Sequence, residues 1–250
     1  MLKLTFLLAA AVLFAAPALA MDIKPGGDTV TMSGPVTGKE CAELQKLIGK
    51  FKIATVVLQD SHGGNAAAGY CVGDLIRKSG IATSIKGYCE SSCSRMWLGG
   101  AHRELADANS WVGLHGNYSD AGELQPDAPH RLRNWLPVMA PAIDETLMEQ
   151  WIHLQKNTQM MRFYQGKASL CSSGYCRPVP DRTAANAGLL ATDMPEEKMK
   201  RLDPDSYPRV GAVSALLELN GLANRDLIQD YLKGSGPKAL AISADGGRTT

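Results

Sequence analysis

The stretch IATVVLQDSHGGNAAAGYCVGDLIRKSG, residues 53–80, sets the architecture of the chain. Its first six residues, 53–58, form a continuous apolar run rich in β-branched side chains, which is typical of a strand buried on both faces of a parallel sheet. A polar break with two glycines follows, and a helical pattern then runs from Ala66 to Ser79 before Gly80 stops it. A buried strand followed closely by such a helix is the first half of a β-α-β unit.

The same alternation continues on both sides of this stretch. We expect further strands at residues 29–32, 81–86 and 110–114, with a short buried helix at 92–98 between the last two. The order β-α-β-α-β with short connections calls for parallel strands joined by right-handed crossovers. The predicted fold class is therefore α/β, a parallel β-sheet of βαβ units flanked by helices.

The N-terminal residues 1–20 predict a secretory signal peptide. Lys3 forms a short basic start, an apolar run extends to Pro17, and small residues precede a cleavage site after Ala20. An uncleaved membrane anchor is the alternative, but the run is short for a bilayer span. We expect a periplasmic or secreted protein with no stable membrane span after cleavage.

The rest of the chain divides into a core domain at residues 21–195 and a helical extension and tail at 196–250. Helix formers dominate residues 131–165, where we expect helices broken at Pro137 and Pro141. The net charge is +1, and the basic residues are scattered rather than gathered in a stripe. Nucleic acid is therefore not expected as a partner.

The cysteines of the predicted mature chain are Cys41, Cys71, Cys89, Cys93, Cys171 and Cys176. An even number of cysteines in an exported chain predicts disulfides. Cys171 and Cys176 bracket a short turn and form the most plausible local pair, whereas Cys89 and Cys93 pair with each other or with Cys71. Zinc is the alternative, but neither closely spaced pair has a histidine at a companion spacing. We expect no metal and no cofactor.

Three loops leave the carboxyl ends of the expected strands, where active sites of open parallel sheets collect. They hold His62 with Gly63 and Gly64, the turn at Ser91, and His115. A hydroxyl nucleophile needs a base within hydrogen-bond reach and N–H groups directed at the developing oxyanion.

Each of these residues also has a structural interpretation. Ser91 is equally placed to cap the helix at 92–98, and His115 to end a strand with an ordinary hydrogen bond. The two glycines fit a plain turn. His62 competes with His115 as the base.

These residues carry a resemblance to a known family. VLQDSHGGNAAAG, residues 57–69, resembles the Clp protease proteolytic subunit and its relatives in the crotonase-like superfamily. GYCESS, residues 87–92, is similar to the segment that holds the nucleophile in that family. VGLH, residues 112–115, is similar to the strand that ends at its catalytic histidine. The Cys-x-Ser-x-Cys version looks like exported, periplasmic Clp-like proteins of Gram-negative bacteria.

The resemblance implies a peptidase-type serine hydrolase that forms homo-oligomers and acts on a peptide or protein. In this chain Ser91 is then the nucleophile and His115 the general base. The N–H of Ser92, with that of Gly63 or Gly64, forms the oxyanion hole.

The chain departs from the family at the third catalytic position, normally an aspartate. The matching stretch around Cys176 holds no acid, and Asp181 is the nearest substitute. Loss of an orienting carboxylate can cost orders of magnitude in rate. A catalytically inactive binding or assembly module is therefore the alternative function. An acyl-CoA enzyme is a poorer third, because CoA thioesters are not expected outside the cytoplasm.

Overall fold

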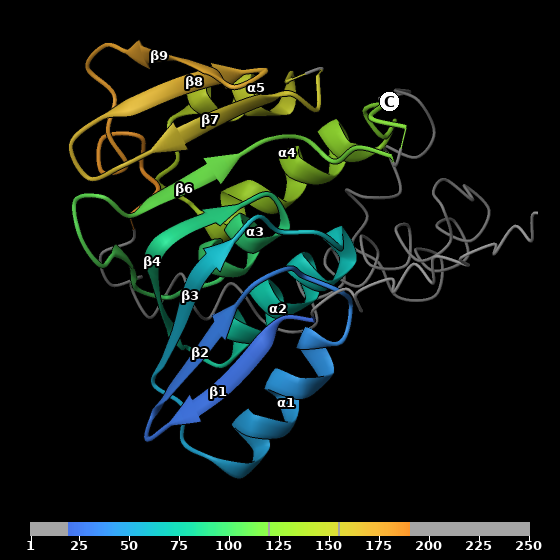
Figure 1. The fold of residues 1–250 in the computed structure, drawn as a ribbon, viewed down its shortest axis with the longest axis vertical. Helices are drawn as coiled ribbons and strands as arrows, with labels where there is room; N and C mark the ends of the chain where they lie inside the picture. Colours follow the sequence, from blue (N-terminus) through green and yellow to red (C-terminus); the bar gives the residue numbers. More distant parts are fainter. Residues whose placement is uncertain (1–19, 120, 155, 191–250) are drawn as a thin grey trace, which may run out of the picture.

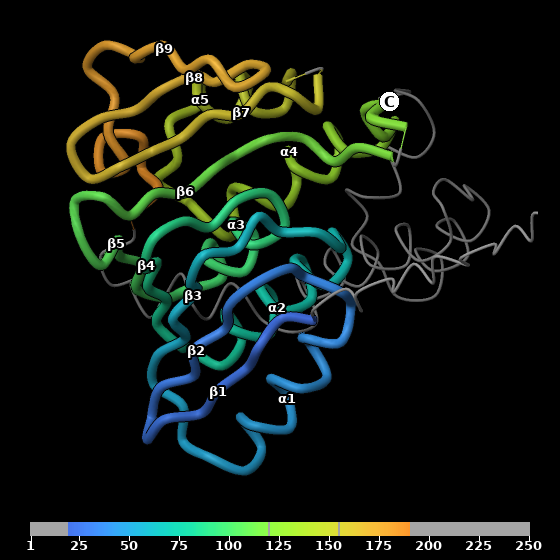
Figure 2. Tube along the Cα trace, in the orientation of Figure 1, coloured from blue at the N-terminus to red at the C-terminus, as the bar shows by residue number. Residues whose placement is uncertain are grey.

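The structure is a computed structural model that describes residues 20–119, 121–154 and 156–190 (Figures 1 and 2). The expected signal peptide, residues 1–20, lies outside this part of the chain except for Ala20, and the expected extension at 196–250 lies wholly outside it. The expected core domain, 21–195, is described as far as Leu190. Within the described residues no helix is long and apolar enough to span a bilayer.

One nine-stranded mixed sheet organises the described residues. Its strands are β1 Asp22–Gly26, β2 Thr29–Ser33, β3 Thr55–Ser61, β4 Ala82–Glu90, β5 Arg103–Leu105, β6 Trp111–Leu114, β7 Gln159–Phe163, β8 Ala168–Ser172 and β9 Tyr175–Val179. They lie in the order β1-β2-β3-β4-β6-β7-β8-β9, and β5 pairs with β4 beside this path. β2, β3, β4 and β6 are parallel, which confirms the predicted α/β class. Antiparallel pairs extend both edges of the sheet.

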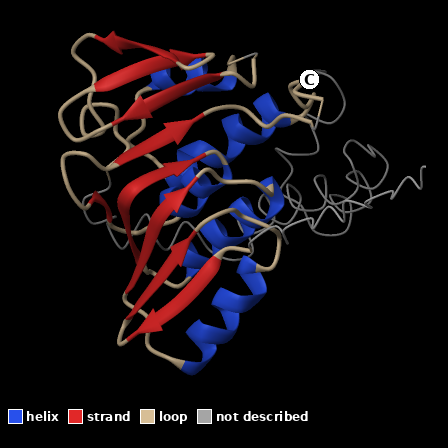
Figure 3. Ribbon diagram, in the orientation of Figure 1, coloured by secondary structure: helices blue, strands red, loops and turns tan. Residues whose placement is uncertain are grey.

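The helices lie on one side of this sheet (Figure 3). They are α1 Glu40–Lys50, α2 Ala66–Lys78, α3 Ser92–Leu98, α4 Ala128–Met139 and α5 Glu145–Ile152. Burial along β3 follows this arrangement, because Val56 and Leu58 are fully buried whereas Val57 between them is half-buried. The expectation that this strand is buried on both faces is therefore wrong for Val57, since helices cover only one face.

Helices α2 and α3 pack unusually closely, and this contact sets the position of the turn that precedes α3. A methyl group added at Gly69 would lie 2.5 Å from the carbonyl oxygen of Ser92, and one added at Gly73 would lie 2.5 Å from that of Arg95. Only a residue without a side chain fits at these two positions. The glycines in the helix sequence thus serve packing and not a bend.

The region expected to be helical, residues 131–165, is helical only in part. Pro137 lies inside α4 and does not break it, whereas the chain does leave the helical conformation before Pro141. Buried neighbours on α4, Trp135 and Met139 among them, hold the helix together across the proline. Residues 159–163 form strand β7, because they pair with β6 on one side and β8 on the other. Tertiary pairing here overrides the local helical preference.

The six cysteines form three disulfides. Cys171 and Cys176 are joined, as expected, across the β8–β9 hairpin. Cys89 and Cys93 are joined to each other, which settles one of the two alternatives left by the sequence. Cys71 pairs with Cys41 and so ties α2 to α1.

Candidate active site

Ser91 occupies a tight turn between β4 and α3. Its backbone has φ 56° and ψ −126°, a conformation that residues other than glycine seldom adopt. Such strain costs about 1–3 kcal/mol and persists only where the surroundings enforce it. Here the N–H of Ser91 donates to the carbonyl of Gly113 at 3.1 Å, and the carbonyl of Ser91 accepts from the hydroxyl of Ser94 at 2.6 Å.

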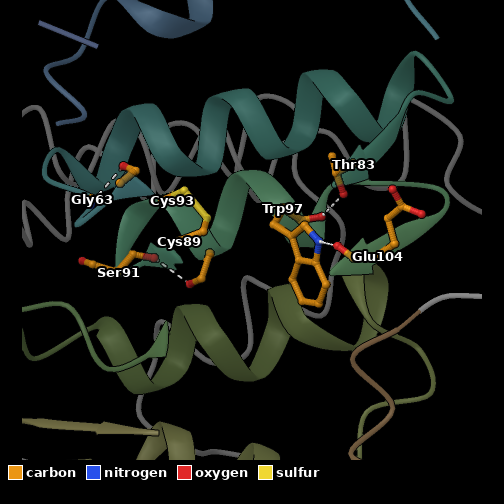
Figure 4. Close-up of a disulfide and its surroundings, with 9 residues drawn as sticks. Gly63, Thr83, Cys89, Ser91, Cys93, Trp97 and Glu104 are labelled. Atoms are coloured by element: carbon orange, nitrogen blue, oxygen red, sulfur yellow. Dashed lines mark hydrogen bonds between the residues drawn. A yellow bond between two sulfur atoms is a disulfide. The ribbon is translucent and has the colours of Figure 1, made fainter. Parts of the chain in front are cut away.

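The disulfide between Cys89 and Cys93 closes the same turn (Figure 4). Both cysteines are fully buried, whereas Ser91 between them is half-buried. The side chain of Ser91 makes no capping hydrogen bond to α3. The helix-cap interpretation therefore does not describe this serine, and its hydroxyl stays available for other contacts.

Gly63 and Gly64 lie against this turn at the end of β3. A methyl group added at Gly63 would lie 2.7 Å from Cβ of Ser91 and 2.8 Å from the backbone nitrogen of Ser92. The φ angles of the two glycines are 83° and 143°, which favour glycine. Two backbone hydrogen bonds with Val36, each 2.9 Å long, hold the loop in place.

The backbone N–H groups near Ser91 differ in their availability. The N–H of Gly63 donates to the hydroxyl of Ser61 at 3.2 Å. In the described part of the chain, the N–H groups of Gly64 and Ser92 donate to no acceptor. Of the three expected oxyanion donors, Gly64 and Ser92 are therefore the two that are free.

His115 lies at the end of β6, the strand beside β4. Its carbonyl accepts a 2.8 Å hydrogen bond from the indole of Trp151, and its ring stacks on Tyr118 with centroids 5.4 Å apart. Burial and, to a smaller extent, the charge of Arg95 lower the pKa of His115 to about 4, although a backbone hydrogen bond with Gly116 opposes them. The imidazole is therefore neutral near pH 7.

Among the described residues, no carboxylate is hydrogen-bonded to the ring of His115. Its Nδ1 is buried and has no hydrogen-bond partner in the described part of the chain, and no hydrogen bond joins the ring to Ser91 there. The parallel register that pairs Glu90 with Gly113 still places Ser91 and His115 at the ends of adjacent strands. The structure thus brings the two residues to the same edge without linking them.

Arg95 supplies the buried positive charge beneath His115. The residue is 1% exposed, and its guanidinium binds the side-chain oxygen of Asn117. Asn117 in turn donates to the hydroxyl of Tyr70 at 3.2 Å, and Arg95 lies over the ring of Tyr70. This polar cluster fixes the loop that follows His115.

Asp181 lies in an exposed turn after β9. Its backbone carbonyl accepts from the side chain of Asn186 at 2.7 Å, and its φ is 55°. Among the described residues its carboxylate makes no hydrogen bond or ion pair. The role expected for Asp181 as an orienting acid remains a prediction.

The sequence named His62 as a competing base, but the polar residues that surround it at this edge were not predicted. Nδ1 of His62 lies 2.7 Å from the carboxylate of Glu90, and its Nε2 lies 3.1 Å from the hydroxyl of Tyr88. Arg162 on β7 donates to the other oxygen of Glu90 at 3.1 Å. Glu90 and Tyr88 are two residues apart on one strand and so share a face, which is the signal the sequence offered. In the described ranges, no group of His, Cys, Asp and Glu residues is arranged to hold a metal ion.

Comparisons with known proteins bear on the fold. No family model matches the chain, and no curated protein matches its sequence. Solved structures that resemble it include a ClpP1 mutant from Listeria monocytogenes, with 19% identity and a TM-score of 0.32 over 38% of this chain and 59% of that chain. The chain thus spans less than two thirds of that protein.

Two further solved structures are similar over more of the chain. A mutant of a membrane-bound stomatin-specific protease has 15% identity and a TM-score of 0.43, over 71% of this chain and 84% of that chain. A protein proposed to be an enoyl-CoA hydratase from Streptomyces coelicolor has 12% identity and a TM-score of 0.43, over 94% of this chain and 92% of that chain. At such identities these are likenesses of fold alone.

Proposed function

We propose that this protein is an exported serine hydrolase of Clp-like architecture, which transfers the acyl group of a peptide or related substrate to water. The observation that carries the proposal is the strained turn at Ser91, with φ 56° and a hydroxyl that does not cap the following helix. Strained backbone of this kind clusters at functional sites. The turn is held by its disulfide and by the Gly63 contact, so the strain is built into the fold.

The proposed reaction begins when the hydroxyl oxygen of Ser91 attacks the acyl carbonyl and its proton passes to His115. His115 is suited to accept a proton near pH 7 because it is neutral there. The carbonyl oxygen becomes an oxyanion, which accepts hydrogen bonds from the free N–H groups of Gly64 and Ser92. The bond from the acyl carbon to the leaving group then breaks, and the leaving group takes the proton from His115, which leaves the acyl group on Ser91. Each such donor contributes about 2.7–4 kcal/mol of transition-state stabilisation in well-studied hydrolases.

The surroundings of His115 in the described part of the chain set an expectation for the rate. A base whose pKa is about 4 holds a proton weakly, and general-base efficiency falls when the pKa lies well below the working pH. No carboxylate in the described residues is bonded to the ring to stabilise the imidazolium. We therefore expect a slow hydrolase.

Labelling with a fluorophosphonate probe tests the proposal. The probe forms a covalent bond with an activated serine, and we expect one equivalent on the wild type and none on Ser91→Ala. Ser172→Ala, at an exposed serine on β8, is the matched control and should label like the wild type. Wild type that does not label, or Ser91→Ala that labels equally, excludes the hydrolase.

The alternative is a catalytically inactive binding or assembly module. The specific observation in its favour is that, within the described ranges, His115 is bonded to neither Ser91 nor Asp181. If this alternative holds, we expect no labelling of the wild type. We also expect Ser91→Ala and His115→Ala to bind every partner that the wild type binds.

We also propose a periplasmic or secreted location and self-association, both on the sequence resemblance and the predicted signal peptide. Three disulfides are compatible with an oxidising compartment. N-terminal sequencing of the exported protein should begin at Met21, and sedimentation velocity should give a mass above that of one chain. A protein retained with Met1, or a strictly monomeric one, contradicts these two expectations respectively.

A further inference from the structure

His62 is the centre of a hydrogen-bonded chain that the proposed reaction has not used. The ionised carboxylate of Glu90 only accepts hydrogen bonds, so Nδ1 of His62, 2.7 Å away, carries the proton. In the neutral form of the ring Nε2 is then the acceptor, and it lies 3.1 Å from the hydroxyl of Tyr88. The pair has the tautomer that a general base needs, with the accepting nitrogen directed away from the carboxylate.

The carboxylate in this chain is itself firmly held. Glu90 is buried, with a side chain 7% exposed, and Arg162 donates to its second oxygen at 3.1 Å. Arg162 lies over the ring of Trp111, with 4.2 Å from the guanidinium to the ring centre. The side chain of His62, by contrast, is 75% exposed. A solvent-facing imidazole is thus oriented by a buried and anchored acid.

This pair lies at the turn that holds the proposed nucleophile. Glu90 directly precedes Ser91 in the chain, and His62 directly precedes Gly63. Gly63 is the residue whose added methyl group would lie 2.7 Å from Cβ of Ser91 and 2.6 Å from the carbonyl oxygen of Glu90. His62 is therefore attached directly to a glycine that packs against the nucleophile.

The two histidines at this edge, His62 and His115, differ in their exposure to water and in whether a carboxylate is bonded to the ring. His115 is largely enclosed and has no carboxylate bonded to it within the described residues. His62 faces water and has a carboxylate positioned to stabilise the imidazolium that forms when a base takes a proton. In acyl transfer the second half-reaction is the one in which the nucleophile is water.

We propose that His62, oriented by Glu90, is the general base that activates water to hydrolyse the acyl group on Ser91. This inference rests on the proposed function. Water takes the place of the Tyr88 hydroxyl at Nε2 and gives its proton to that nitrogen as its oxygen bonds to the acyl carbon. The bond from that carbon to the hydroxyl oxygen of Ser91 then breaks. The proton passes from His62 to that oxygen, which leaves a free carboxylic acid and a regenerated Ser91.

The test separates formation of the acyl-enzyme from its hydrolysis. p-Nitrophenyl acetate acetylates the disulfide-intact protein and releases nitrophenolate, a leaving group that needs no proton. Intact-protein mass spectrometry then follows the loss of the acetyl group after excess ester is removed. The variants are His62→Gln and, as a matched control, His153→Gln, an exposed histidine that also pairs with a glutamate, Glu149.

We expect His62→Gln to form the acetyl-enzyme as the wild type does and to lose the acetyl group about a hundredfold more slowly, the usual scale of general-base catalysis. His153→Gln should match the wild type in both steps. Deacetylation of His62→Gln at the wild-type rate overturns the proposal. So does a loss of acetylation and deacetylation in equal measure, because that result places His62 in the first step or in folding.

A second variant and a second readout guard against misreading a structural effect. Glu90→Gln keeps the imidazole but removes its orienting charge, so we expect acetyl-enzyme to accumulate there too. The Nδ1–H proton resonance of His62 should move upfield in this variant, whereas an unchanged resonance contradicts the assigned hydrogen bond. If wild type itself is never acetylated on Ser91, the proposed hydrolase fails and this inference falls with it. That failure is distinct, because it is already present without any mutation.

Discussion

Gly63 and Ser91 are in such close contact that a methyl group on the glycine would lie 2.7 Å from Cβ of the serine. Real Cβ atoms do not approach one another so closely, so the loop after β3 and the turn after β4 fit together only through this glycine. The same added methyl group would lie 2.8 Å from the backbone nitrogen of Ser92. The arrangement of the nucleophile and its amide donors therefore depends on one missing side chain.

Gly63→Ala should displace this loop and weaken the site. The left-handed φ of 83° costs an alanine about 1–2 kcal/mol before any clash is counted. We expect a loss of at least that much in the free energy of unfolding by urea, together with a slower reaction with fluorophosphonate. Gly166→Ala, where an added methyl group meets open space, is the control. Equal labelling rates for both variants would show that the contact does not shape the site.

The disulfide between Cys89 and Cys93 should matter to Ser91 more than a similar disulfide elsewhere. It closes a sequence separation of 4 around the serine, and the disulfide between Cys171 and Cys176 closes one of 5 in an exposed hairpin. Paired substitution of the first two cysteines by alanine should reduce the rate of fluorophosphonate labelling at least about tenfold. The same change at the second pair should leave that rate within about twofold. A similar effect of both changes would place the influence in general stability.

The pH dependence of labelling reports the base in the first step. Burial and the charge of Arg95 lower the pKa of His115 to about 4, so this imidazole is neutral and able to accept a proton down to that pH. We expect the labelling rate of folded protein to fall only near pH 4. His115→Gln should label much more slowly at every pH. A fall centred near pH 6.5, the usual value for histidine, would assign the step to another group.

Asp74 on α2 should make stability depend on pH in the direction opposite to most carboxylates. It accepts a 3.1 Å hydrogen bond from the indole of Trp135, and burial raises its pKa to about 7 despite that bond and nearby cations. Between the unfolded pKa of 3.8 and about 7, the folded state holds a proton that the unfolded state has lost. Stability contributed by this group is thus fully present below pH 3.8 and is lost as the pH rises through that window.

Asp74→Asn removes the titration while it keeps an oxygen for Trp135. The gap of about 3 pKa units corresponds to on the order of 4 kcal/mol. Relative to wild type, Asp74→Asn should therefore gain stability toward urea on going from pH 4 to pH 8. A difference between the two proteins that stays constant over this range would contradict the burial of an ionisable group there.

The parallel centre of the fold was predictable because its signals are local. The apolar run at residues 53–58, the polar break and the helix at Ala66 follow one another without interruption, and the structure has β3 and α2 at these places. The turn at Ser91 follows from the same logic. A short connection between a strand and a buried helix leaves few conformations for the residue between them.

The outer strands were not predictable, because their signals are not local. The residues of β7 include Met160 and Met161, which suit a helix equally well. Their strand conformation depends on pairing with β6, whose residues lie far away in the sequence. The contact of Glu90 with Arg162 is hidden for the same reason, since it exists only once β7 joins the sheet. The residues that hold the second imidazole, His62, therefore became evident only in three dimensions.

The central claim is that Ser91 attacks a carbonyl whose oxygen is held by the N–H groups of Gly64 and Ser92. A crystal structure of the protein after reaction with a fluorophosphonate tests it most directly. The account predicts phosphorus bonded to the side-chain oxygen of Ser91, with a phosphonyl oxygen within hydrogen-bond distance of both N–H groups. An unmodified Ser91, or an adduct whose oxygen points away from both amides, would contradict it.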